Sequence, residues 1–158
     1  VDAAGDGLCV QGFSGYGRED VQIPVAKAFT EPWSPAVRAR IAGLRPRSEN
    51  RDGAAIRHAS RTLDTTGART RLLLVLSDGR PLDCGDPRYR GDYALADTAA
   101  ALRDARAKGQ HTLGVTVASD PAAQGRRLYG PGGHTLVRAS ERLGPRLAAL
   151  VLRRTHRG

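Results

Sequence analysis

A group of aspartates in the second half of the chain offers the clearest candidate chemistry, because acidic residues are sparse elsewhere. The group consists of Asp78, Asp83, Asp86, Asp92 and Asp97. Asp78 follows an apolar run and precedes Gly79, so we expect a buried strand to hold its carboxylate at the edge of a sheet. A carboxylate there, with hydroxyl or amide oxygens from neighbouring loops, suits a hard divalent cation such as Mg²⁺. The alternative is an ordinary turn with solvated aspartates, since Asp-Gly is a frequent turn dipeptide.

Other catalytic patterns are missing from the sequence. It has no P-loop, and Gly5-Asp6-Gly7 precedes a strand, which is the wrong side for a dinucleotide-binding fingerprint. Ser14 lacks the final glycine of a nucleophile elbow, and no Ser-His-Asp set is suggested by the spacing. The histidines are isolated and lack the spacing of metal ligands; they are His58, His111, His134 and His156.

The elements that would position these residues alternate along the chain. We expect strands over 7–13, 70–76, 111–118 and 134–137, with a weak edge strand over 21–25. We expect helices over 34–44, with Ser34 as cap, and over 52–63, 94–108 and 140–154. We expect loops or turns over 14–17, 80–93 and 128–133.

This alternation of strands and helices predicts a parallel α/β sheet. The run over 70–76 is continuously apolar, as expected for a central strand covered on both faces. In open sheets of this kind, ligands bind beyond the carboxyl ends of the strands. Here that rule indicates the loops after Phe13, Leu76 and Ala118.

Composition limits the class of protein. A length of 158 residues suits one domain, and the apolar fraction of 40% with only 4% aromatics predicts a core of Leu, Val, Ala and Ile. No apolar run reaches the roughly 18 residues that span a bilayer. Cys9 and Cys84 form no C-x-x-C pattern, which is typical of a reducing cytoplasm. The net charge of +9 comes from scattered arginines without interleaved aromatics, so it favours nucleic-acid binding only weakly.

Three stretches resemble a von Willebrand factor A domain. The run over 72–81 (LLLVLSDGRP) resembles the fourth-strand segment of that family, and 49–59 (ENRDGAAIRHA) is similar to its second metal-site loop and helix. A more distant relative, the von Willebrand-type domain of the large cobaltochelatase chain, shares the Glu-Asn-x-Asp-Gly pattern. Downstream, the run over 82–85 (LDCG) resembles one subgroup of the family, which contains the nitric oxide reductase activation proteins and the Rubisco-activation adaptors. Within that subgroup, this run slightly favours the Rubisco type. Further positions shared with that subgroup are Tyr89, Tyr93, Asp97 and Thr98.

The resemblance covers nearly the whole chain and implies a fold. This fold is a Rossmann-like open, mostly parallel sheet with helices on both faces, forming a single domain over 1–158. The family's first strand and its D-x-S-x-S segment are not found, so we expect an N-terminally truncated domain. That strand is central in the family, between 8–13 and 71–76. We therefore expect this segment not to be an autonomous stable domain, and to gain stability when about 30 upstream residues, roughly one strand plus one helix, are restored.

The resemblance also implies a metal-ion-dependent adhesion site built from three segments. Asp78 matches the third segment, and Asn50 aligns with the position where many members of the family have Thr. With the first segment missing, we expect Asp78 and Asn50 alone to bind Mg²⁺ weakly.

By the same resemblance, the chain is a metal-dependent protein-binding domain and not an enzyme. It would serve an accessory protein that couples a MoxR-type AAA+ ATPase to activation of a target enzyme, Rubisco or nitric oxide reductase. A carboxylate of the partner would complete the Mg²⁺ coordination. Ser14 and Asp83 would shape the rim, and Arg80, Arg88 and Arg90 would pair with acidic groups of the partner.

Two other functions stay open from the residues alone. The acidic loop could serve a metal-assisted hydrolase, with Asp83 or His58 as the base, although their spacing favours neither. The basic charge could serve a nucleic-acid-binding domain, whose affinity would fall steeply with salt and need no metal.

Overall fold

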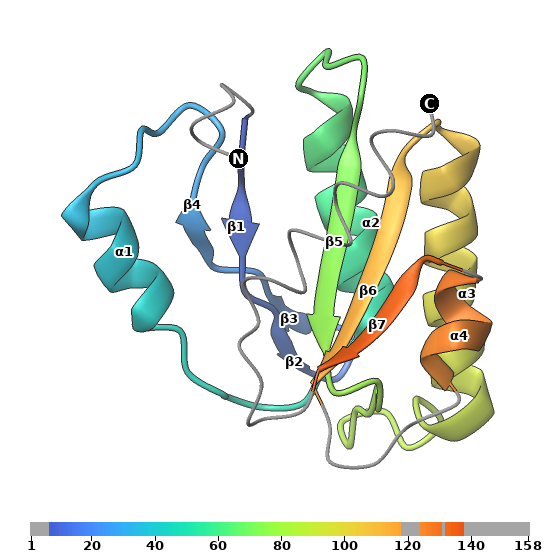
Figure 1. The fold of residues 1–158 in the computed structure, drawn as a ribbon. Helices are drawn as coiled ribbons and strands as arrows, with labels where there is room; N and C mark the ends of the chain where they lie inside the picture. The colour runs from blue at the N-terminus through green and yellow to red at the C-terminus, as the bar shows by residue number, and fades with distance from the viewer. Residues whose placement is uncertain (1–6, 118–123, 131, 138–158) are drawn as a thin grey trace.

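A computed structural model describes residues 7–117, 124–130 and 132–137. Its strands are β1 (Val10–Gln11), β2 (Ser14–Tyr16), β3 (Asp20–Gln22), β4 (Val25–Lys27), β5 (Leu72–Ser77), β6 (His111–Val117) and β7 (His134–Val137). Its helices are α1 (Pro35–Ala42), α2 (Asp52–Asp64), α3 (Gly91–Ala107) and α4 (Gln124–Tyr129). The described part combines these helices with a three-stranded parallel sheet, an arrangement compatible with the predicted α/β class (Figure 1).

The parallel sheet has the order β5-β6-β7. Leu72 pairs with His111, and Gly114 pairs with His134. The strands predicted over 70–76, 111–118 and 134–137 are therefore confirmed, except that residue 118 lies outside the described residues. Among the described strands, however, β5 pairs with β6 alone and so lies at an edge of this sheet rather than at its centre. Leu76 near its end is accordingly 43% exposed.

The N-terminal strands form two separate antiparallel pairs, β1 with β4 and β2 with β3. The loop predicted over 14–17 is wrong for residues 14–16, because Ser14–Tyr16 pairs with β3. It is right for Gly17, whose φ of 75° permits the tight turn between the two strands. The predicted edge strand over 21–25 divides into β3 and β4 around Pro24, which has no N–H for a ladder. The strand predicted over 7–13 shrinks to Val10–Gln11.

The helices begin close to their predicted positions. Ser34 Oγ accepts a hydrogen bond from Val37 N at 3.2 Å, which caps α1 as expected. Helix α2 starts at Asp52 as predicted, whereas α3 starts at Gly91, earlier than residue 94. The turn predicted over 128–133 is wrong in its first part, because α4 ends only at Tyr129. The helix predicted over 140–154 lies outside the described residues.

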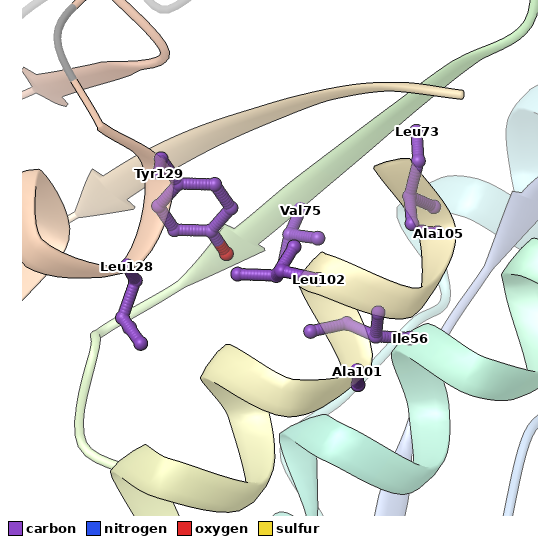
Figure 2. Packing of buried hydrophobic residues seen from close by; sticks show 8 residues of the cluster. All are labelled: Ile56, Leu73, Val75, Ala101, Leu102, Ala105, Leu128 and Tyr129. Carbon is purple, nitrogen blue, oxygen red and sulfur yellow. The ribbon is translucent and has the colours of Figure 1, made fainter. Parts of the chain in front are cut away.

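The main core lies between β5 and helices α2, α3 and α4 (Figure 2). Its buried members are Ile56, Leu73, Val75, Ala101, Leu102, Ala105, Leu128 and Tyr129. Leu128 and Tyr129 belong to this cluster, so burial explains why a short helix forms where the local pattern predicted a turn. Gly114 on β6 is required for this packing, because a Cβ there would lie 2.3 Å from the Tyr129 ring.

A second apolar cluster lies on the opposite face of the parallel sheet, since successive strand residues point to opposite faces. It contains Leu113, Val115 and Val137, with Leu72 and Leu74 packed against it. Within the described residues, α2, α3 and α4 share the face opposite this cluster, so helices on both faces are not seen there. In the same part of the chain, no helix combines the length and apolarity needed to cross a bilayer.

Candidate functional site

The backbone brings three distant segments together beside the end of β5. Gly15 N on β2 donates to Glu49 O at 2.8 Å. Asn50 N donates to Leu82 O at 2.9 Å, and Leu82 N returns a hydrogen bond to Asn50 O at 3.2 Å. Residues 49–50 are thus fixed between the β2–β3 hairpin and the loop after β5. The structure therefore places Asn50 beside the start of the acidic loop.

Asp52 joins the two segments that carry the predicted metal ligands. Asn50 Nδ2 donates to Asp52 Oδ1 at 2.5 Å, and Ser77 Oγ donates to Asp52 Oδ2 at 3.1 Å. Gly79 N in turn donates to Ser77 Oγ at 3.0 Å, which fixes the turn that contains Asp78. Because its amide nitrogen is engaged by Asp52, Asn50 retains its carbonyl oxygen as an acceptor.

The carboxylate of Asp52 is deeply buried, with a relative exposure of 3%. Burial raises its pKa from 3.8 to about 6, although the hydrogen bonds from Asn50 and Ser77 act in the opposite direction. The nearby charge of Asp78 contributes to the increase. Asp52 was not among the predicted site residues, and the signal that could have indicated it is its place in the Glu-Asn-x-Asp-Gly pattern.

Asp78 is exposed at the end of β5, and its Oδ1 accepts a hydrogen bond from Arg80 N at 3.0 Å. Oxygen-bearing side chains lie nearby in the hydrogen-bonded chain formed by Asn50, Asp52 and Ser77. Such a set fits the preference of Mg²⁺ for hard oxygen ligands. Within the described residues, no three His, Cys, Asp or Glu side chains could hold a metal by themselves, so the amide and hydroxyl oxygens would be needed.

Asp83 lies in the interior, at 1% exposure, rather than on the rim where the resemblance put it. Its Oδ2 is 2.6 Å from Arg51 Nη1, and its Oδ1 accepts from Gly17 N at 2.7 Å and Gly85 N at 2.9 Å. Burial raises the pKa of Asp83, but these hydrogen bonds outweigh that effect and hold the pKa below its ordinary value. Arg51 Nη2 also lies 3.5 Å from Asp86 Oδ2.

Arg51 connects this buried pair to a second network between α2 and α3. Its guanidinium lies 4.1 Å from the centroid of the Tyr89 ring, a cation–π contact. Tyr89 Oη donates to Asp97 Oδ2 at 2.8 Å, and Arg57 Nη2 lies 2.7 Å from Asp97 Oδ1. Gly53 allows this close approach, because a Cβ there would lie 2.0 Å from Asp97 Oδ2. The network fixes the N-terminal turn of α2 against α3.

The other predicted rim residues divide between interior and surface. Ser14 is buried, and its Oγ accepts a hydrogen bond from the backbone N–H of Ser48 at 3.1 Å. Arg80, Arg88 and Arg90 are exposed, although Arg88 Nε lies 3.2 Å from the carboxylate of Asp86. The three arginines therefore remain accessible to a partner, whereas Ser14 supports the backbone.

The loop residue Cys84 and the N-terminal Cys9 are both free thiols, Cys84 being exposed. Cys84 N donates to the Glu49 carboxylate, and that carboxylate raises the pKa of the Cys84 thiol. His58, the alternative hydrolytic base, is half-buried on α2. The structure gives no further reason to assign a catalytic role to Cys84 or His58.

No protein-family model matches this sequence. Among curated proteins, Protein NorD of Brucella suis is 39% identical over 137 residues, which cover 87% of this chain and 21% of that protein. An uncharacterized protein of Pseudomonas aeruginosa is 38% identical over 153 residues, which cover 97% of this chain and 25% of that protein. Protein NorD of Stutzerimonas stutzeri is 33% identical over 138 residues, which cover 87% of this chain and 22% of that protein. The chain thus spans a quarter or less of the length of these relatives.

Proposed function

We propose that this chain is the partner-binding domain of an accessory protein that activates nitric oxide reductase. Relatives named Protein NorD share 33–39% identity over 87% of the chain. The nitric oxide reductase activation proteins are also one branch of the subgroup that the loop after β5 resembles. The relatives therefore favour this target over Rubisco, toward which the run over 82–85 leaned.

In this proposal, residues 1–158 form a single von Willebrand factor A domain. The parallel order β5-β6-β7, with α2, α3 and α4 on one face, is compatible with the Rossmann-like sheet of that family. The domain binds rather than catalyses. Its partners are a MoxR-type AAA+ ATPase and, through an acidic side chain, the target enzyme in the cytoplasm.

The observation that carries the proposal is the hydrogen-bonded junction through Asp52. It links the Asn50 segment to the end of β5, which supports a site formed there by the Asn50 amide oxygen and the Asp78 carboxylate. These two residues would hold Mg²⁺, which when bound leaves a coordination position for a partner carboxylate. Asp52 orients the Asn50 amide, and the exposed Arg80 adds a guanidinium beside the same edge.

Replacing Asp78 by Ala in the intact protein tests this mechanism. We expect nitric oxide reductase activation and Mg²⁺ binding, measured by calorimetry, to be lost while circular dichroism and the melting curve stay unchanged, because Asp78 is exposed. The matched control is Asp92→Ala, an exposed aspartate in the first turn of α3. Full activation by the Asp78 variant would reject metal-bridged capture.

A further inference from the structure

A pocket of about 220 Å³ lies apart from Asp78, between the β2–β3 turn and the N-terminal turns of α2 and α3. Arg18 of the turn, Arg57 of α2 and Tyr93 of α3 contribute to its lining, and Val21 and Ala54 add apolar surface. We propose that this pocket binds a glutamate or aspartate side chain of a partner protein, without a metal ion. This inference rests on the proposed partner-binding function but uses a different part of the surface.

Among the charged side chains of the pocket, the unused hydrogen-bonding capacity consists of donors. Both carboxylate oxygens of Asp97 are occupied, one by Tyr89 Oη and the other by Arg57 Nη2. Arg57 uses only Nη2 in these contacts, so its other N–H groups face no acceptor within the described residues. Arg18 is exposed and has no hydrogen bond or ion pair there. A ligand that satisfies two guanidinium groups must be an acceptor, and a carboxylate matches their planar geometry.

The backbone beside Arg18 and the side chain of Arg57 are fixed before any ligand arrives. Arg18 follows Gly17, whose N–H is bonded to the buried Asp83 carboxylate at 2.7 Å. Gly17 packs so closely on the next loop that a Cβ on Gly85 would lie 2.3 Å from Gly17 N. Arg57 is held by Asp97 at 2.7 Å. Since the Arg57 guanidinium is already ordered, a ligand that binds it gains more of that contact energy as affinity.

The aromatic wall favours a protein side chain as the ligand. Tyr93 is 58% exposed, and its ring meets the buried Tyr89 ring nearly edge-on, with centroids 5.9 Å apart at 86°. The exposed ring and Val21 offer apolar surface to the methylene groups of an acidic side chain, while Arg18 and Arg57 lie nearby for its carboxylate. Tyrosine and arginine together are typical of the residues that dominate binding at protein interfaces.

The test uses a fluorescently labelled hexaglutamate peptide, its hexaglutamine counterpart and inorganic phosphate, all in EDTA. We expect the protein to bind hexaglutamate, and Arg18→Glu to weaken that binding about tenfold or more, the loss of one charge-assisted contact. Tyr93→Ala should also weaken it, because the apolar surface for the methylene groups is lost. Arg69→Glu is the matched control, because this substitution changes the charge by the same amount. Arg69 is exposed and lies between α2 and β5, outside the pocket. The control substitution should change the affinity less than twofold.

Three results would overturn the assignment. The first is that the protein binds hexaglutamate no more tightly than hexaglutamine. The second is an equal loss of hexaglutamate affinity in the Arg18 and Arg69 variants. The third is that the protein binds phosphate but not the peptide. The Asp78→Ala protein should still bind hexaglutamate in EDTA. The pocket and the metal-bridged mechanism can therefore fail separately.

Discussion

Ser77 at the end of β5 donates a hydrogen bond to Asp52 at the start of α2, with 3.1 Å between Ser77 Oγ and Asp52 Oδ2. The contact ties a strand of the parallel sheet to the helix that covers it. It also buries a carboxylate that receives hydrogen bonds from Asn50 and Ser77 but has no ion pair within the described residues. A buried carboxylate of this kind makes the folded state sensitive to pH.

The first prediction concerns the pH dependence of folding. Because the pKa of Asp52 is about 6 in the folded chain and 3.8 ordinarily, the folded state binds more protons between these values. Stability must then fall as pH rises through this interval, by ~3 kcal/mol for a difference of this size. Asp52→Asn removes the titrating group, so the variant should gain stability relative to the wild type from pH 4 to pH 7.

Urea unfolding across this pH range measures the effect. The control is Asp92→Asn, which removes an exposed carboxylate from the first turn of α3. Its stability should follow the wild-type profile. Parallel profiles for the wild type and Asp52→Asn would show that Asp52 does not titrate as its burial requires.

The second prediction concerns the ion pair between Asp83 and Arg51, whose side chains are 0% and 9% exposed. Asp83→Ala leaves the buried guanidinium without its closest partner and two backbone N–H groups, of Gly17 and Gly85, without an acceptor. We expect a loss of about 3–5 kcal/mol in the free energy of unfolding. Asp92→Ala should cost less than about 0.5 kcal/mol, as at other exposed positions.

Urea denaturation of both variants distinguishes the two roles considered for Asp83. A residue on the binding rim would lose partner affinity on substitution while keeping its stability. If Asp83→Ala unfolds at the wild-type urea concentration, the structural role is wrong.

The fold was predictable where local pattern and tertiary packing agree. The apolar run of β5 and the amphipathic face of α2 are read directly from the sequence. The β2–β3 hairpin was missed because Gly15 and Gly17 indicate a loop, whereas backbone pairing needs no side chain. Helix α4 was missed because Leu128 and Tyr129 are stabilised by distant core residues rather than by local periodicity.

Of the candidate site, the sequence indicated the exposed Asp78 and the half-buried Asn50, but not the buried carboxylates. Asp78 follows from its position at the end of an apolar run, and Asn50 from a resemblance. The burial of Asp83 depends on Arg51, 32 positions away in the sequence, and no local pattern encodes that pairing. For the same reason, the buried Asp52 could not be distinguished from a solvated first-turn aspartate.

The third prediction tests the close packing of β6 against α4. A Cβ on Gly114 would lie 2.3 Å from the Tyr129 ring, so Gly114→Ala forces the ring or the strand to move. We expect a loss of about 1–3 kcal/mol in the free energy of unfolding, as for other overpacked cores. Gly7→Ala is the control, because its Cβ would meet Phe29 at an ordinary 3.4 Å. Equal midpoints in urea for the two variants would contradict the packing.

The fourth prediction concerns Gly53, which allows Asp97 to reach both Tyr89 and Arg57. Gly53→Ala places a methyl group 2.0 Å from Asp97 Oδ2, so the carboxylate must move and its hydrogen bond to Tyr89 Oη breaks. We expect a loss of about 1–3 kcal/mol, the cost of overpacking together with an unsatisfied buried hydroxyl.

A double-mutant cycle separates this contact from any effect of alanine on α2 itself. In an Asp97→Ala background the clashing carboxylate is absent, so Gly53→Ala should cost little or even stabilise the helix through the higher helix propensity of alanine. The two substitutions should therefore couple by about 0.5–3 kcal/mol, the range for residues in direct contact. Urea unfolding of the four proteins gives this coupling energy. A coupling energy near zero would mean that Gly53 and Asp97 act independently. The close approach of Asp97 would then not be the reason that position 53 needs glycine.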